Sequence, residues 1–205
     1  MKYFILIFSL LSASVFSQQT DDFRSIKGYY NQHRNMLNQE FKKKFDKEQN
    51  TFVKIGIKND FQLFMKKMDS IENIALIGAL LKTKNLEDLQ HFKSLKSNQN
   101  NNVFPQTIDK NADYPGGINA LRQEVANLFY SDGVYSEIKD VKTQVAFIVE
   151  KDGSISNVKA EGENFTFNRQ AEIALYSVFE RFSPAYMNGN PVRYRFRLPL
   201  SLKFD

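Results

Sequence analysis

Three arginines near the end of the chain, Arg193, Arg195 and Arg197, recur at every second position, and Pro199 and Ser201 continue the same spacing. On a β-strand this spacing places all five side chains on one face. Arginine forms strong charge-assisted hydrogen bonds with carboxylates, and proline is tolerated in a strand only where its missing N–H faces no neighbouring strand. The five residues therefore predict an open sheet edge that binds an extended, acidic peptide by strand addition. The alternative is that the arginines only protect an exposed edge from aggregation.

No set of residues predicts catalysis, a metal or a cofactor. The chain has no cysteine and only two histidines, His33 and His91, which argues against thiolate zinc sites, iron–sulfur clusters, multi-histidine metal sites and a cysteine nucleophile. The motifs of serine hydrolases, zinc proteases, P-loop proteins and dinucleotide-binding folds are absent from the sequence. Glu161 and Glu163 could form an acid–base pair, but their spacing defines no cleft. We expect a protein that is not an enzyme, with no catalytic residues, cofactor, metal or small-molecule substrate.

The basic composition does not indicate a nucleic-acid partner. The formal net charge is +5, and the surplus of positive residues lies in 18–111, whereas 112–205 is nearly neutral. No stripe of Arg and Lys alternates with stacking aromatic residues as in a nucleic-acid-binding motif. We therefore expect a protein or peptide partner, and no nucleic acid.

The N-terminal residues have the pattern of a cleavable signal peptide. Lys2 precedes an apolar run over 4–16, and the small residue Ser17 follows. A membrane-spanning helix needs about 20 apolar residues, more than this run supplies. We expect residues 1–17 to be removed by cleavage after Ser17, which places the protein in the periplasm or outside the cell. The alternative is an uncleaved N-terminal membrane anchor.

Residues 18–97 predict a mainly helical region, and residues 98–111, rich in Asn and Gln, predict a linker. The first helix has apolar side chains at steps of three and four, which share one face: Phe23, Ile26, Tyr30, His33, Leu37, Phe41 and Phe45. A short strand is expected next, over 51–58, from the alternation of Val53, Ile55 and Ile57. Two further helices are expected over 60–82, which has a broad apolar side, and over 85–95, with Asn85 as N-cap.

Residues 112–205 predict a small α+β domain. Its strands alternate apolar and polar residues, its helices show steps of three and four, and Gly153 supplies the positive φ of a tight turn. The expected fold is a three-stranded antiparallel sheet with two helices on one face, preceded by the mainly helical region. The expected order is a helix after the turn at 114–117, strands over 141–149 and 154–160, a helix from Asn164 or Thr166 to Phe182, a turn at 188–191 and a final strand over 194–204.

The order of these motifs resembles the TonB C-terminal domain family, in the form found in Bacteroidetes envelope proteins. In that family the last strand of a small sheet accepts a short extended peptide from an outer-membrane receptor. The resemblance therefore implies the same binding edge and a partner such as an outer-membrane receptor segment. The matching segments are Tyr-Pro-Gly-Gly at 114–117, Val-Glu-Lys-Asp-Gly-Ser-Ile at 149–155, Phe-Ser-Pro-Ala at 182–185, Asn-Gly-Asn-Pro-Val at 188–192, Leu-Pro-Leu at 198–200 and Lys-Phe at 203–204.

Three functions remain open from the sequence. We favour a non-enzymatic envelope protein that binds an extended segment on its last strand and is linked to TonB-dependent transport. The second is a membrane-anchored TonB-type energy transducer for outer-membrane receptors, although such a transducer also needs a long Pro-rich spacer and the chain has only 5 prolines. The third is a structural envelope protein that forms a homodimer through the sheet edge.

Overall fold

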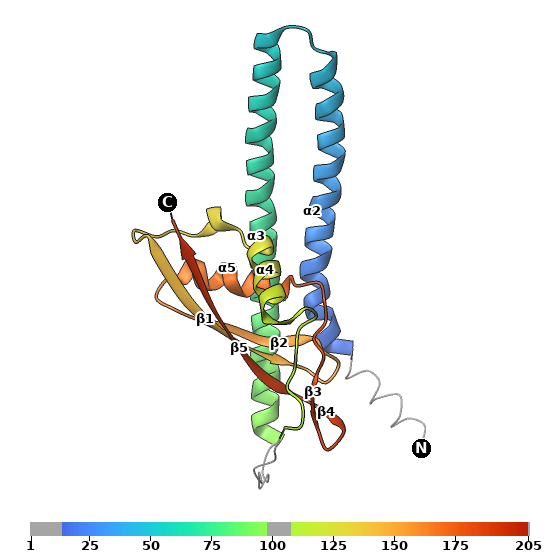
Figure 1. Ribbon diagram of the computed structural model, residues 1–205, viewed down its shortest axis with the longest axis vertical. Coiled ribbons are helices and arrows are strands. Elements are labelled where there is room, and N and C mark those ends of the chain that lie inside the picture. Colours follow the sequence, from blue (N-terminus) through green and yellow to red (C-terminus); the bar gives the residue numbers. More distant parts are fainter. Residues whose placement is uncertain (1–13, 98–107, 205) are drawn as a thin grey trace.

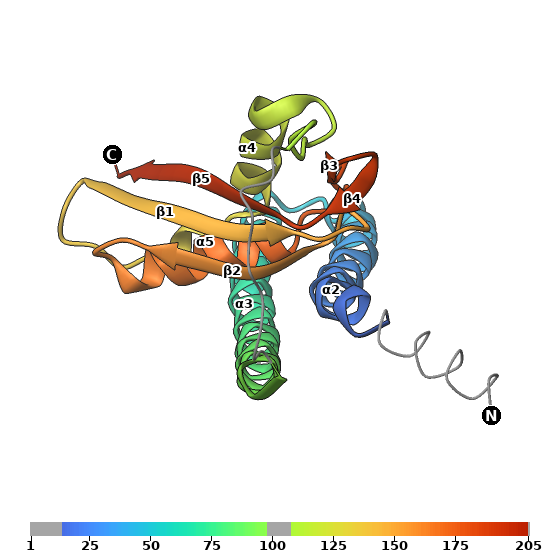
Figure 2. The ribbon, with the colours of Figure 1, turned by 90° about the horizontal axis from the view of Figure 1, so that it is seen from below.

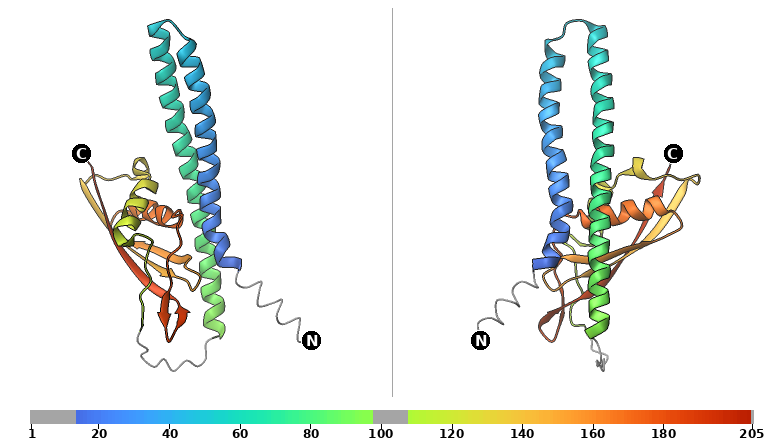
Figure 3. Two further views of the ribbon diagram at one scale, coloured as in Figure 1. Left: turned by 45° about the vertical axis from the view of Figure 1, so that its right-hand side comes forward. Right: turned by 180° about the vertical axis from the view of Figure 1, so that it is seen from behind.

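The computed structural model describes residues 14–97 and 108–204, which form an α+β fold as predicted (Figure 1). Two long helices form a hairpin, and a smaller α+β unit packs beside it, away from the loop that joins the two helices (Figure 3). The predicted signal peptide falls mostly on residues 1–13, and the predicted linker mostly on 98–107, both outside the described residues. The elements are α2 (Ser14–Lys47), α3 (Thr51–Ser97), α4 (Gly117–Leu128), a 3-10 turn (Ser131–Gly133), β1 (Asp140–Val149), β2 (Ile155–Glu161), α5 (Phe165–Tyr176), β3 (Ala185–Met187), β4 (Asn190–Val192) and β5 (Tyr194–Lys203).

Helix α2 packs on α3 along the apolar face that its sequence predicts. Phe41 of α2 stacks on Phe61 of α3, with ring centroids 4.1 Å apart and ring planes 15° apart. Arg34 of α2 donates hydrogen bonds to Asp69, at 2.6 Å, and to Glu72. Aromatic stacking and a partly buried ion-pair cluster thus hold the two helices together.

The strand predicted over 51–58 is wrong, because these residues begin α3. Asn50 caps this helix: its Oδ1 accepts the N–H of Phe52 at 2.9 Å and the N–H of Val53 at 3.3 Å. A side-chain cap satisfies N–H groups that the first turn leaves without a partner. Helix propensities of β-branched residues differ from those of good helix formers by less than about 1 kcal/mol each, so capping and packing decide the structure.

The two helices predicted over 60–82 and 85–95 are one continuous helix. Asn85 is not an N-cap but lies inside α3. Thr83 and Glu87, on either side of it, are both buried. Packing against the α+β unit therefore continues through the predicted break and keeps the backbone helical.

The larger sheet has three antiparallel strands in the order β2-β1-β5, with β1 in the centre (Figure 2). Val145 of β1 lies opposite Leu198 of β5, and both side chains are fully buried. They belong to one apolar core with residues of α4 and α5, such as Leu121 and Leu175. Removing this apolar surface from water is what fixes the helices on one face of the sheet, and α5 lies between the sheet and the helical hairpin (Figure 3).

Helix α5 starts at the predicted N-cap but is shorter than predicted. Asn164 Oδ1 accepts the N–H of Phe167 at 2.8 Å, which confirms the cap. The helix ends at Tyr176 instead of Phe182. The apolar spacing continues past the end, so periodicity alone could not mark it.

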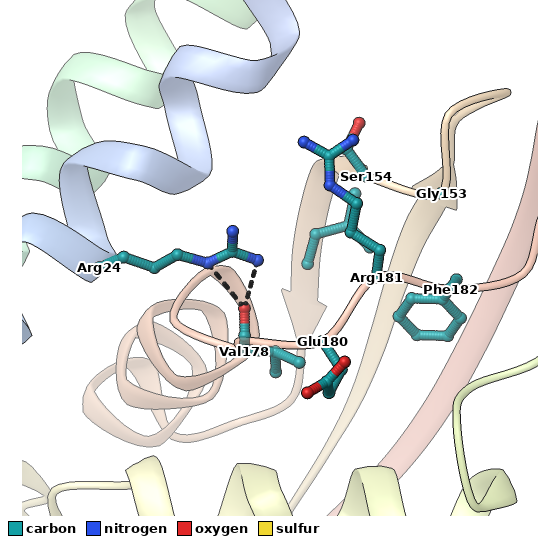
Figure 4. Close-up of a pocket in the computed structure, with 8 residues that line it drawn as sticks. Arg24, Gly153, Ser154, Val178, Glu180, Arg181 and Phe182 are labelled. Atoms are coloured by element: carbon teal, nitrogen blue, oxygen red, sulfur yellow. Dashed lines mark hydrogen bonds between the residues drawn. The ribbon is translucent and has the colours of Figure 1, made fainter.

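A contact with α2 holds the chain that follows α5. Arg24 donates a hydrogen bond from Nη2 to the carbonyl of Val178 at 3.0 Å (Figure 4). It also donates to the carbonyl of Phe179 at 2.8 Å. The cavity beside Arg24 has a volume of only about 10 Å³, room for no more than one water molecule. This contact therefore joins the hairpin to the α+β unit and is not a ligand site.

The turn predicted over 188–191 lies in a second, two-stranded sheet of β3 and β4. Asn188 and Gly189 form its tip, with positive φ angles of 51° and 74°. Lys110 forms a bridge to Tyr186 of β3, so the end of the predicted linker is part of the folded unit.

Candidate functional site

Strand β5 lies at an edge of the larger sheet, as predicted from Pro199. It pairs with β1, and no other strand of the described residues pairs with it. Arg195, Arg197, Pro199 and Ser201 are all exposed on the face of the sheet opposite the core. The structure thus brings four of the five predicted residues onto one exposed face of one edge strand.

The main-chain groups of these four residues point away from the sheet. Phe204, just beyond β5, donates its N–H to the carbonyl of Lys139, at 2.8 Å, on the side of β1. Main-chain direction alternates along an antiparallel strand, so the even-numbered residues of β5 bond to β1 and the odd-numbered residues face outward. Pro199 fits this arrangement because its missing N–H costs β1 no hydrogen bond.

Arg193 stands apart from the other predicted residues. It precedes β5, and its guanidinium donates to Glu150 Oε1 from Nη2, at 2.8 Å, and from Nε, at 3.2 Å. The same Oε1 accepts the hydroxyl of Ser156 at 2.6 Å. Arg195 and Arg197, in contrast, have no carboxylate of the described residues within ion-pair distance. Arg195 and Arg197 therefore supply free positive charge in the middle of the edge, and the exposed Lys203 adds a further cation at its end.

The opposite edge of the sheet, β2, is closed by side chains. Helices α3 and α5 supply donors and acceptors that replace a neighbouring strand. The contacts are Asn157 N–H to Glu87 Oε1 at 2.7 Å, Val158 N–H to the Tyr176 hydroxyl oxygen at 3.1 Å, Ala160 N–H to Glu172 Oε1 at 2.8 Å, and Lys84 Nζ to the Val158 carbonyl. The two edges thus differ: β2 already has partners, whereas no side chain of the described residues bonds to the main chain of β5.

Glu87 and Tyr176 are the centre of this closure. The Tyr176 hydroxyl donates to Glu87 Oε1 at 2.7 Å. Burial raises the pKa of Glu87, partly offset by the hydrogen bonds from Tyr176 and Asn157. Burial and the neighbouring Glu87 also raise the pKa of Tyr176. Both groups have structural partners, so their shifted pKa values do not by themselves indicate catalysis.

The residues that close β2 are not among those predicted from the sequence. One signal could have found Glu87: it continues the buried face of α3 at steps of three and four, after Leu76, Ala79, Leu80 and Thr83. A carboxylate on such a face needs a buried donor. The identity of that donor depends on the tertiary fold, because Tyr176 is 89 positions away.

A groove of about 1050 Å³ runs between the end of α3 and the outer face of the sheet, and Arg195 and Arg197 line its far side. Lys159 and Glu161 of β2 form an exposed ion pair of 2.8 Å within it. The hydrogen bond and charge of Lys159 lower the pKa of Glu161, and Arg195 and Arg197 add to this effect. Next to Pro199 and Ser201 lies a second, open hollow of about 580 Å³. Together these hollows leave room over the outer face beside β5.

The two carboxylates that the sequence offers as an acid–base pair, Glu161 and Glu163, are both exposed. Glu161 is paired with Lys159, and Glu163 lies beyond the end of β2, so these two carboxylates do not meet as an acid–base pair across a buried cleft. Within 14–97 and 108–204, no group of three or more His, Asp or Glu side chains could hold a metal ion. An acidic strand added to β5 would place alternate side chains over Arg195 and Arg197.

Comparison with known protein families and with curated proteins finds no match to this chain. In the part of the chain that the structure describes, none of the helices combines the length and the apolar composition required to span a membrane.

Proposed function

We propose that this protein is an exported envelope protein whose β5 edge binds an extended, acidic segment of another protein, in a role linked to TonB-dependent transport. The observation that carries the proposal is the difference between the two sheet edges. Side chains close β2, whereas the outward main-chain groups of β5 are available to a guest strand. The resemblance to the TonB C-terminal domain supports the same strand.

The chemistry of the edge defines the guest. Arg195, Arg197 and Ser201 each offer an N–H and a carbonyl, and Pro199 offers a carbonyl only. Main-chain hydrogen bonds to these groups give affinity for any extended segment, and side chains beside them give selectivity. Two exposed ion pairs contribute about 0.2–1 kcal/mol each, so an acidic guest should bind about two- to thirtyfold more tightly than a neutral one.

The proposal can be tested with three synthetic peptides, end-capped and ten residues long, in which Val alternates with Glu, Ser or Lys. Titration into the ¹⁵N-labelled full chain should shift the amide signals of Arg195, Arg197 and Ser201 most, with affinity in the order Glu, Ser, Lys. Shifts that concentrate on β2, or equal affinity for the Glu and Lys peptides, would contradict the proposed edge.

Two substitutions at Arg197 distinguish the contribution of its side chain to peptide binding from that of its main-chain N–H. Arg197→Ala removes the guanidinium but keeps the N–H, whereas Arg197→Pro removes both without touching the bonds to β1. Losing one hydrogen bond costs about 0.5–1.5 kcal/mol, so Arg197→Pro should bind the neutral peptide about two- to tenfold more weakly than Arg197→Ala. Lys151→Ala, an exposed change in the turn before β2, is the control and should bind normally. Equal binding by the two Arg197 variants would argue against strand addition.

One of these variants and one further measurement test the other two functions. If the edge forms a homodimer instead, Arg197→Pro should lower the sedimenting mass of the chain in the absence of any peptide. If the protein is an anchored transducer, N-terminal sequencing of cell fractions should find residues 1–17 retained and the protein in the membrane fraction. Cleavage after Ser17 would argue against the anchored form.

A further inference from the structure

Helix α3 carries a second apolar face, separate from the one that packs on α2 and on the α+β unit. Six large apolar residues on this face are each at least 50% exposed. We call the set, together with Gly78, the outer stripe: Phe64, Ile71, Ile74, Leu81, Leu89 and Phe92. Single exposed apolar residues need no explanation, but a continuous stripe on one helix indicates an interaction surface.

The spacing of the outer stripe is that of a helix–helix contact. From Phe64 to Leu81 the stripe residues fall on positions 64, 71, 74, 78 and 81, and with Lys67 these follow the steps of three and four of a coiled-coil heptad repeat. Phe92 continues the same repeat, and Leu89 lies one residue after its position 88. The stretch 64–92 is about 42 Å long and covers roughly four heptads, enough to specify a helical pair. The buried residues Leu76, Leu80 and Thr83 lie on a different side of α3, so the outer stripe remains available in the folded chain.

Gly78 lies at the middle of the outer stripe. It is exposed, and a Cβ built there would meet no atom within 4 Å, so no contact among the described residues requires a glycine. Glycine inside a helix costs about 1 kcal/mol relative to alanine. At a helix crossing, however, glycine lets two backbones approach closely. Phe64 and Phe92 are equally far from Gly78 in the sequence, which makes the outer stripe nearly symmetric about this residue.

We propose that a second copy of this chain docks on the outer stripe, with the two α3 helices antiparallel and crossing at Gly78. Residues at about equal distances before and after Gly78 then face each other across a two-fold axis, as an isologous dimer requires. Phe64 and Phe92 are each 14 residues from Gly78 and meet between the copies, and Ile74, four residues before Gly78, lies beside Leu81, three residues after it, of the other copy. This dimer is independent of β5.

Two charged residues beside the outer stripe, Lys67 and Asp88, select the antiparallel orientation. Lys67 precedes Gly78 by almost the same distance as Asp88 follows it, so each Lys67 lies beside Asp88 of the second copy. Both side chains are exposed, and neither has an ion-pair partner within 4 Å among the described residues. A parallel pair would instead place Lys67 beside Lys67 and Asp88 beside Asp88, which like-charge repulsion opposes.

Sedimentation equilibrium of the full chain tests the dimer. The chain should show twice the monomer mass at about 0.1 mM, a concentration that detects even weak association. Ile74→Glu and Leu81→Glu should each weaken the dimer at least tenfold, and Gly78→Leu should do the same although its side chain enters open space in the monomer. Ile55→Glu, at an equally exposed site away from the outer stripe, should leave the mass unchanged. A monomer at this concentration, or a dimer that survives Leu81→Glu, would overturn the proposal.

A charge exchange tests the orientation. Lys67→Glu and Asp88→Lys should each weaken the dimer, and the double variant should restore it, because the pairs between copies are then reversed. Lys66→Glu, one residue earlier and about 100° around the helix, is the matched control and should have no effect. Failure of the double variant to restore the dimer would exclude the antiparallel pair.

Cysteine cross-linking gives a second measurement, since the chain contains no cysteine of its own. Mixing Lys67→Cys chains with Asp88→Cys chains should give mixed disulfide dimers, and Gly78→Cys should cross-link to itself. Cross-linking of Lys67→Cys chains mainly with one another would indicate a parallel pair and overturn the proposal.

Discussion

Replacing Tyr176 by Phe is a direct test of how the β2 edge is closed. The hydroxyl donates to Glu87 Oε1 at 2.7 Å and accepts the N–H of Val158 at 3.1 Å. Tyr176 and Val158 are both fully buried. The substitution therefore leaves a buried N–H without an acceptor and removes one donor from a buried carboxyl group.

The size of the effect follows from these two hydrogen bonds. An unpaired buried N–H costs about 1–3 kcal/mol, and loss of the second hydrogen bond adds about 1 kcal/mol. The aromatic ring remains, with Phe23 stacked on it at 5.2 Å between centroids, so no large cavity forms. We expect the free energy of unfolding to fall by about 2–4 kcal/mol, which lowers Tm by roughly 5–15 °C for a domain of this size.

Urea unfolding followed by circular dichroism measures this change. Tyr194→Phe is the matched control, because Tyr194 is half-buried on β5 and its hydroxyl has no hydrogen-bond partner among the described residues. It should change the free energy of unfolding by less than about 0.5 kcal/mol. If Tyr176→Phe is as stable as the wild type, or Tyr194→Phe loses as much, the hydrogen bonds do not hold the edge.

Glu87→Gln should remove a pH dependence of stability. Because burial raises the pKa of Glu87, its contribution is full below the ordinary value of 4.5 and is lost as pH rises through the raised pKa of the folded protein. Wild type should therefore lose stability relative to Glu87→Gln from pH 4.5 upward, and parallel urea-unfolding curves would contradict this. Gly153→Ala should cost about 2 kcal/mol or more, since its Cβ would lie 2.0 Å from the Phe182 carbonyl oxygen. Gly189 also has a positive φ but lies in open space, so Gly189→Ala should lower the free energy of unfolding by only about 1 kcal/mol. Equal losses of stability in the two variants would show that the clash with the Phe182 carbonyl is not the cause.

The parts of the structure that follow from local sequence were predictable. The alternation along β5 placed its inner and outer faces correctly, because a strand has a side-chain period of two residues. Pro199 indicated an edge strand for an equally local reason, its missing N–H. Asn164 was expected as an N-cap, and its side chain makes that hydrogen bond.

The parts that depend on distant residues were not predictable. Closure of β2 needs Glu87, Glu172 and Tyr176, which reach it from two different helices. The end of α5 at Tyr176 coincides with carbonyls that bind Arg24, 154 positions away. The periodic spacing of α3 could indicate that Glu87 is buried, but no local pattern in the sequence indicates its partner Tyr176 or the partners of Arg24, so the difference between the two edges required the structure.

Two errors in the first half of the chain have local causes. The alternation of Val53, Ile55 and Ile57 is too short to separate a strand from a helix, and the cap at Asn50 was overlooked. The broad apolar side predicted over 60–82 is in fact two faces: Phe61 packs on α2, whereas Phe64 is exposed. When apolar residues cover a large part of the helix circumference, the sequence alone does not show whether they form one buried face or two separate faces.

The chain order of the sheet has a consequence for when the protein can fold. The central strand β1 needs β5, yet β5 is the last of the elements to be synthesised. The α2–α3 hairpin has its partners close in sequence and can form early, whereas the sheet must wait for contacts of long sequence separation. Until β5 is synthesised, the main-chain groups of β1 that face it have no hydrogen-bond partners. The α+β unit therefore cannot complete its fold while the chain is still emerging from the ribosome. Such a delay is compatible with the proposed export, because a chain that crosses a membrane must still be unfolded when it does so.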